Sequence, residues 1–185
     1  MTNQKNEFTK AVATKIQPFK GWSILLALVL IATTAVAALA SNENAIGHTF
    51  HNTFTKWGTN SPTPPTRDDP AKMEGVVDGD VGPGRFVGEA IDIVVDPATN
   101  TISIEAFYHF NGSKHAFTAH VYVTHNNNNN PPTATIIGDV TEGWLKGASV
   151  TGEYIVVGVG GDCLDGPPNI NPFCFQGELD IKVPK

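Results

Sequence analysis

Four histidines lie close together in the middle of the chain, and one of them has a candidate carboxylate partner. They are His109, His115, His120 and His125, and Glu105 precedes them. A glutamate and a histidine held in contact can act as a general acid/base couple or can orient a polar ligand. Glu105 and His120 are therefore the candidate catalytic pair.

Contact within this pair depends on the hairpin that joins the two segments. The turn sequence Asn111-Gly112-Ser113-Lys114 separates two runs in which apolar and polar residues alternate. A turn over all four residues places Glu105 opposite His120, whereas a two-residue turn places Glu105 opposite Thr118. Both members of the pair lie on the polar face of their strands, so a solvent-facing contact is the alternative to catalysis.

Other kinds of site have little support in the sequence. Glu105 and His109 lie about 13 Å apart along a strand that rises about 3.3 Å per residue, too far to share an ion whose ligand bonds are about 2 Å long. The glycines of residues 82–88 lack the dinucleotide-binding spacing and precede a strand, not a helix. The chain contains no G-x-S-x-G motif and no Walker motif. We therefore expect neither a metal nor a cofactor, and no motif indicates nucleophilic catalysis.

The charge of the chain restricts its partners. After Ala40 the sequence has eight Lys and Arg against seventeen Asp and Glu, with no basic cluster. Nucleic acid and anionic membrane surfaces are therefore not expected as partners. Nothing in the sequence indicates an oligomeric state.

The first forty residues have the composition of an export signal. Four lysines precede the apolar run 22–40, which ends in Ala38-Leu39-Ala40. The small residues favour a signal peptide that is cleaved after Ala40. An uncleaved signal anchor is the alternative, because the 19-residue run is at the lower edge of what spans a bilayer. Either interpretation places the rest of the chain outside the cytoplasm, and residues 22–40 are the only expected membrane contact.

Cys163 and Cys174 are the two cysteines of the chain. In an oxidising compartment they are expected to form a disulfide bond. Closing a loop of about a dozen residues contributes on the order of 3 kcal/mol in the chain-entropy model. A metal-binding or redox pair is the weaker alternative, because C-x-x-C spacing and a nearby histidine are missing.

The sequence divides the exported part into a linker region and a folded domain. In residues 41–73, Ile46, Phe50, Phe54 and Trp57 are spaced as on one side of a short helix. The prolines that follow indicate an extended linker. The domain is therefore expected to span residues 74–185.

Alternating apolar and polar residues predict that this domain is all β. Short turn sequences join the strands as consecutive hairpins, a meander. Closure into a small antiparallel β-barrel of seven or eight strands would hide both sheet edges, and a β-sandwich is the alternative. The seven expected strands cover residues 75–78, 85–96, 101–110, 115–125, 133–141, 144–159 and 173–183.

One glycine-rich pattern occurs twice in the domain. Residues 79–88 and 138–147 both read G-D-V-x-x-G-x-(large apolar)-x-G, and we expect two superposable hairpin corners. The segments Gly84-Arg-Phe-Val-Gly-Glu-Ala90 and Gly143-Trp-Leu-Lys-Gly-Ala148 resemble the glycine and aromatic pattern of the allene oxide cyclase and dirigent-protein barrels. This resemblance implies an eight-stranded barrel with a lumen. It implies no particular activity, because the catalytic residues of neither family match positions here.

A barrel with an apolar inner face either fills itself with side chains or holds one small ligand. We expect a small apolar ligand. A non-catalytic structural or adhesion module at the cell surface is the alternative, and a cyclase-like or isomerase-like enzyme is the third hypothesis. The residues expected to line the ligand site are Ile104, Tyr108, Phe117, Val121 and Trp144.

Overall fold

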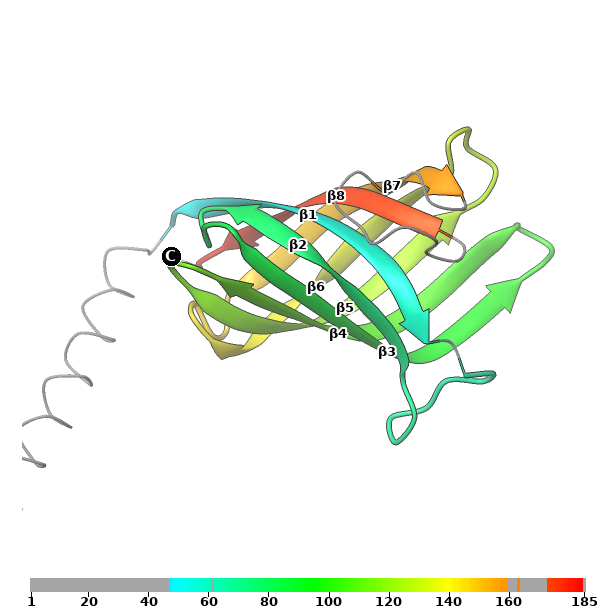
Figure 1. Ribbon diagram of the computed structural model, residues 1–185, viewed down its shortest axis with the longest axis horizontal. Helices are drawn as coiled ribbons and strands as arrows, with labels where there is room; N and C mark the ends of the chain where they lie inside the picture. Colours follow the sequence, from blue (N-terminus) through cyan, green and yellow to red (C-terminus); the bar gives the residue numbers. More distant parts are fainter. Residues whose placement is uncertain (1–46, 61, 160–162, 164–172, 185) are drawn as a thin grey trace, which may run out of the picture. The chain divides into compact units, whose positions relative to one another are not determined.

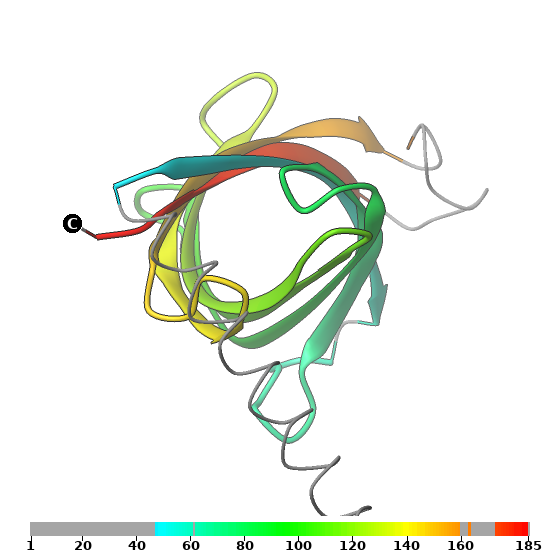
Figure 2. The same ribbon diagram turned by 90° about the vertical axis from the view of Figure 1, so that its left-hand side faces the viewer.

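The computed structural model describes residues 47–60, 62–159, 163 and 173–184. These residues form an all-β fold in which eight antiparallel strands follow one another around a closed barrel (Figures 1 and 2). Closure comes from pairing between the first strand and the last. The barrel predicted from the sequence is therefore confirmed. The strands are β1 (Thr49–Asn60), β2 (Ala71–Gly79), β3 (Gly84–Asp96), β4 (Thr101–Gly112), β5 (Ala116–Asn126), β6 (Thr133–Gly143), β7 (Ser149–Val159) and β8 (Phe173–Lys182).

The first strand corrects the predicted helix and domain boundary. Phe50, Phe54 and Trp57 lie on β1, which pairs with both β2 and β8. The spacing of four between the two phenylalanines satisfies the two-residue period of a strand as well as the helical period. The barrel thus begins at Thr49 instead of Glu74, and the proline-rich segment is the connection between β1 and β2.

The N-terminal predictions concern a different part of the chain. The expected signal peptide or anchor, cleavage after Ala40 and the position of Ile46 lie outside the residues that the structure describes. Within the described ranges, no helix has both the length and the apolar character needed to cross a membrane.

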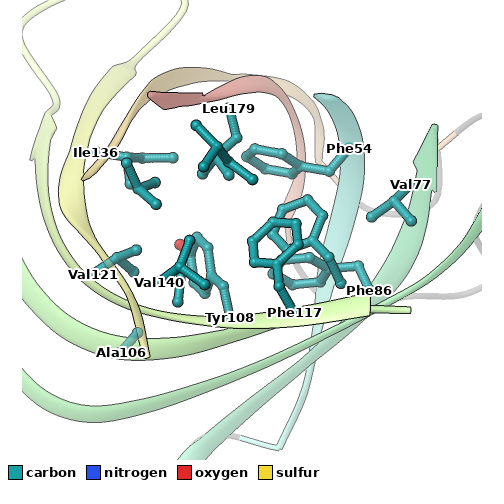
Figure 3. Packing of buried hydrophobic residues seen from close by; sticks show 14 of the residues in the cluster. Phe54, Val77, Phe86, Ala106, Tyr108, Phe117, Val121, Ile136, Val140 and Leu179 are labelled. Atoms are coloured by element: carbon teal, nitrogen blue, oxygen red, sulfur yellow. The ribbon is translucent and has the colours of Figure 1, made fainter. Parts of the chain in front are cut away.

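Aromatic rings fill much of the barrel interior. The Phe54 ring stacks on Phe86 with centroids 5.6 Å apart, and the Phe110 ring stacks on Phe117 at 4.7 Å. Figure 3 shows the rings of Phe54, Phe86 and Phe117 gathered inside the strands. Each fully buried large side chain contributes about 1.5–3 kcal/mol to the free energy of unfolding. This packed core holds the strands whose remaining inward side chains form the site described below.

The repeated glycine pattern does not mark two equivalent corners. Both copies lie near hairpin turns, but Gly84 begins β3 whereas its counterpart Gly143 ends β6. Gly79 has a φ of 99° at the end of β2, whereas its counterpart Gly138 lies inside β6. The expectation of superposable corners is therefore wrong, and the repeat is a coincidence of glycines needed at different positions of two turns.

Candidate ligand site in the barrel lumen

The Glu105 and His120 side chains meet on the outer surface. Glu105 pairs with Tyr122, and His120 pairs with Phe107, so neither expected register is correct. The two side chains nevertheless meet diagonally, with His120 Nε2 2.8 Å from Glu105 Oε1. They are about a quarter exposed, and the His120 ring stacks on Phe107. Because inward residues alternate with these on both strands, the pair faces away from the barrel interior.

The other histidines of this region have separate partners. His109 Nδ1 lies 3.0 Å from Thr118 Oγ1, and His115 stacks on Trp144. Among the residues with described positions, no three His, Cys, Asp or Glu side chains are grouped so that they could hold a metal ion.

The five residues expected to line one ligand site are divided between two regions. Ile104 and Tyr108 line a cavity in the lumen. Phe117 and Val121 are instead packed in the hydrophobic core, and Trp144 contacts Phe50 and His115 near the β6–β7 turn.

The lumen cavity has a volume of about 170 Å³ and a mostly apolar lining. Two hollows of about 380 and 350 Å³ are larger, but residues from the outer faces of the strands, such as Glu153, Glu178 and Thr118, line them. Enclosed, apolar cavities with a few convergent polar groups are the usual sites for small molecules. The lumen cavity fits this description better, because Lys56, Tyr108 and Tyr154 supply its polar groups.

Lys56 is the unusual member of this lining. Strand alternation directs it inward with Phe54, and its side chain is only 2% exposed. Its Nζ donates a hydrogen bond to the Tyr108 hydroxyl. The same nitrogen lies 4.4 and 4.3 Å from the ring centroids of Tyr108 and Tyr154. Among the described residues, no carboxylate oxygen lies within 4.0 Å of it.

Burial governs the protonation of the groups in this cavity. Desolvation lowers the pKa of Lys56 to about 7, so a large fraction of the side chain is a neutral amine at neutral pH. Desolvation also raises the pKa of Tyr108 and of Tyr154, which keeps both phenols protonated. His125 is 7% exposed, and burial lowers its pKa, with a further contribution from the charge of Lys56. The lumen thus favours neutral polar groups.

The predicted disulfide is confirmed. Cys163 and Cys174 are bonded, with their Cα atoms 5.4 Å apart. Trp57 packs against them on the outer side of β1. Cys174 stands in β8 between Phe173 and Phe175, which line the cavity.

Sequence reasoning missed Lys56 because it assigned residues 41–73 to a helix and a linker. A usable signal was present: Phe50, Asn52, Phe54, Lys56 and Gly58 form one face of a strand. A lysine in the middle of such a face would have stood out once the strand was recognised.

Comparison with known proteins assigns no family to this barrel. The chain matches no protein-family model, no curated protein and no solved structure. Its function must therefore be argued from the lumen itself.

Proposed function

We propose that this protein is an exported barrel that binds a small, mostly apolar ligand in its lumen, with one polar group of the ligand against Lys56. The observation that carries the proposal is a buried lysine that faces an apolar cavity and has no carboxylate partner among the described residues. Burying such a group costs several kcal/mol of desolvation unless it is paired or becomes neutral. A barrel filled only for structural purposes would be more stable with an apolar residue at this position.

The cavity limits the size of the ligand. An apolar cavity of about 150 Å³ accommodates a benzene molecule, and the lumen cavity has a volume of about 170 Å³. One ring or a short chain is therefore the appropriate size. Lys56 donates one hydrogen bond to Tyr108, and an ammonium or amine group has further donors. The polar group of the ligand is therefore expected to be an oxygen acceptor.

Export is the second part of the proposal. The disulfide supports it, because such bonds persist in oxidising compartments. The basic and apolar leader supports cleavage after Ala40, with anchoring through residues 22–40 as the alternative. N-terminal sequencing of the exported protein tests this part, and an intact leader would contradict cleavage.

Binding is tested with toluene and benzyl alcohol, which differ by one hydroxyl group. Methyl chemical shifts of Ile93 and Ile104, which line the cavity, report occupancy in NMR titrations of the full chain. Wild-type protein is expected to bind benzyl alcohol about tenfold more tightly, as one hydrogen bond to a polar group of the site would give. Lys56→Met should bring the two affinities together while leaving toluene binding in place.

A variant that fills the cavity provides a second test of binding. A Cβ atom at Gly58 would meet no heavy atom within 4 Å, and this glycine lines the cavity. Gly58→Leu should therefore fold and abolish binding of both compounds. Ala98→Leu, in the exposed β3–β4 turn, is the matched control that should bind like wild type. The proposal fails if neither compound shifts the two isoleucines, or if Gly58→Leu binds as wild type does.

A further inference from the structure

We propose that Lys56 is a covalent site for small apolar aldehydes, which its side-chain amine captures as an imine. This inference rests on the proposed ligand site and names the class of ligand that the site would take. Lys56 lines the cavity, and its nitrogen lies beside Tyr108 and Tyr154, which line it as well, so a carbonyl group bound there would lie near this nitrogen. The surrounding groups are aromatic rings and a phenol, and no described carboxylate holds the nitrogen as an ion pair.

The protonation state of the lumen suits this reaction. Only the neutral amine has the lone pair that attacks a carbonyl carbon, and desolvated lysines provide it near neutral pH. Burial lowers the pKa of Lys56 to about 7. Lys72 also lines the cavity but is exposed, so it serves as the internal comparison for the buried Lys56.

The reaction balances without an oxidant, a reductant or a cofactor. The amine lone pair forms a bond to the carbonyl carbon, and the electron pair of the C=O bond moves to oxygen. A proton passes from nitrogen to oxygen and gives a carbinolamine. The hydroxyl group then leaves with a second proton as water, while the C=N bond forms. One aldehyde and one amine thus become one imine and one water.

Tyr108 is the group best placed to move these protons. Its hydroxyl already accepts a hydrogen bond from Lys56 Nζ, so it lies within reach of the atoms that exchange protons. Burial raises its pKa, so the phenol stays protonated and can donate a hydrogen bond to the departing hydroxyl group. The apolar lining also holds little water, which favours the imine over its hydrolysis.

An apolar carboxylate is the competing ligand for this site. It would need the protonated form of Lys56 and would gain an ion pair in place of a covalent bond. Burial of the lysine favours its neutral form, so a neutral carbonyl compound suits the lumen better.

Reductive trapping tests the inference. Purified full-length protein is incubated at pH 7 with benzaldehyde and sodium cyanoborohydride, which converts an imine to a stable secondary amine. Peptide mapping by mass spectrometry then locates the benzyl group. We expect labelling of Lys56 to exceed labelling of Lys72 by more than about tenfold, because Lys56 is buried beside the bound aldehyde whereas Lys72 is exposed.

Two variants show whether labelling requires both the Lys56 amine and the open cavity. Lys56→Met removes the amine, whereas Gly58→Leu keeps it and fills the cavity. Both should lose the lumen label and keep the background on surface lysines, and Ala98→Leu should label as wild type does. Tyr108→Phe should slow labelling of Lys56 while benzaldehyde affinity, measured by NMR without reductant, stays within about threefold, a difference of under 1 kcal/mol.

The outcomes separate this inference from the proposed function. If benzaldehyde shifts the Ile93 and Ile104 methyls and benzyl alcohol displaces it, but the label is spread evenly over surface lysines, the covalent inference is wrong and the binding site stands. If benzoate binds more tightly than benzaldehyde, the lysine serves as an anion site and the inference is also wrong. If none of the three compounds shifts these methyls, both proposals fail.

Discussion

The side chain of Lys56 donates a hydrogen bond to the hydroxyl of Tyr108 inside the barrel, 52 residues further along the chain. The two residues come from strands β1 and β4, which are not neighbours in the sheet. Their contact therefore crosses the lumen. Both groups are almost fully buried, so removing either one leaves the other desolvated without its partner.

The stability of the barrel should rise with pH above neutrality because of Lys56. Burial lowers its pKa to about 7 in the folded barrel, whereas an exposed lysine titrates near 10.5. Between these values the unfolded chain binds one more proton, so the free energy of unfolding increases with pH. At 1.36 kcal/mol per pKa unit, the gain between pH 7 and 9 is about 2 kcal/mol. Urea denaturation at pH 6, 7, 8 and 9 measures it.

Other titratable groups that face Lys56 set the limits of the pH range over which the free energy of unfolding increases. His125 also has a lowered pKa, which adds a rise of the same sign below pH 6.5. Tyr108 and Tyr154 have raised pKa values, so stability should fall again above about pH 10, where only the unfolded chain ionises. Lys56→Met should flatten the profile between pH 7 and 9. If the free energy of unfolding rose with pH equally in wild type and in this variant, the rise would have to come from other residues.

Tryptophan fluorescence should report the protonation of His115. Its ring stacks on Trp144 with centroids 3.9 Å apart, and a protonated imidazole quenches a stacked indole. Burial, followed by the charge of Lys114, lowers the pKa of His115 below 6.5, with Asp80 opposing the shift. The fluorescence should therefore fall with a midpoint below pH 6.5, and Lys114→Met should raise that midpoint. Trp144→Phe is the control, and a transition that survives it must come from another tryptophan.

Glu105 and His120 should be dispensable for the lumen site. Their contact lies on the outer surface and is partly exposed. Glu105→Gln and His120→Ala are each expected to lower the free energy of unfolding by less than about 1 kcal/mol. Neither should change benzyl alcohol affinity or the labelling of Lys56. A loss of labelling in either variant would connect the outer pair with the chemistry of the lumen.

Removal of the disulfide should destabilise the barrel without abolishing its fold. Cys163 and Cys174 close a loop with a sequence separation of 11, and Trp57 packs on the bond. The double variant Cys163→Ser/Cys174→Ser should lower the free energy of unfolding by about 3 kcal/mol, as chain-entropy loss predicts for such a loop. Denaturant midpoints under non-reducing conditions provide the measurement. An unchanged midpoint would mean that the native bond is offset by strain or by a compact unfolded state.

Period-two alternation correctly predicted seven of the eight strands, because inward and outward residues differ clearly on these strands. Strand β1 was missed because Phe50 and Phe54 fit two periods equally well. The β4–β5 register was missed for a different reason. Its turn is held by the adjacent hairpin, through hydrogen bonds from Lys114 N to Val81 O and from Ser113 N to Pro83 O. Such contacts between distant segments cannot be inferred from the local turn sequence.

The residues that line the cavity could likewise be predicted only in part from the sequence. Tyr108 and Ile104, two of the residues expected at a ligand site, line the cavity because both lie on the inner face of β4. The aromatic packing that fills the lumen around Phe117 and leaves space beside Lys56 depends on the summed volumes of side chains from all the strands. No single segment of sequence contains that information.

Closure of the barrel through β1 and β8 also determines when the site can exist. Phe54 pairs with Gly177, and Asn52 with Leu179, so the strand that carries Lys56 finds this neighbour at the other end of the barrel sequence. The ribosome makes β1 before the other strands of the barrel, and the edge of β1 stays without its β8 partner until β8 has been synthesised. A nascent chain therefore has an exposed lysine with ordinary reactivity. The selective capture of an aldehyde proposed above would therefore begin only after β8 has been made and has closed the lumen.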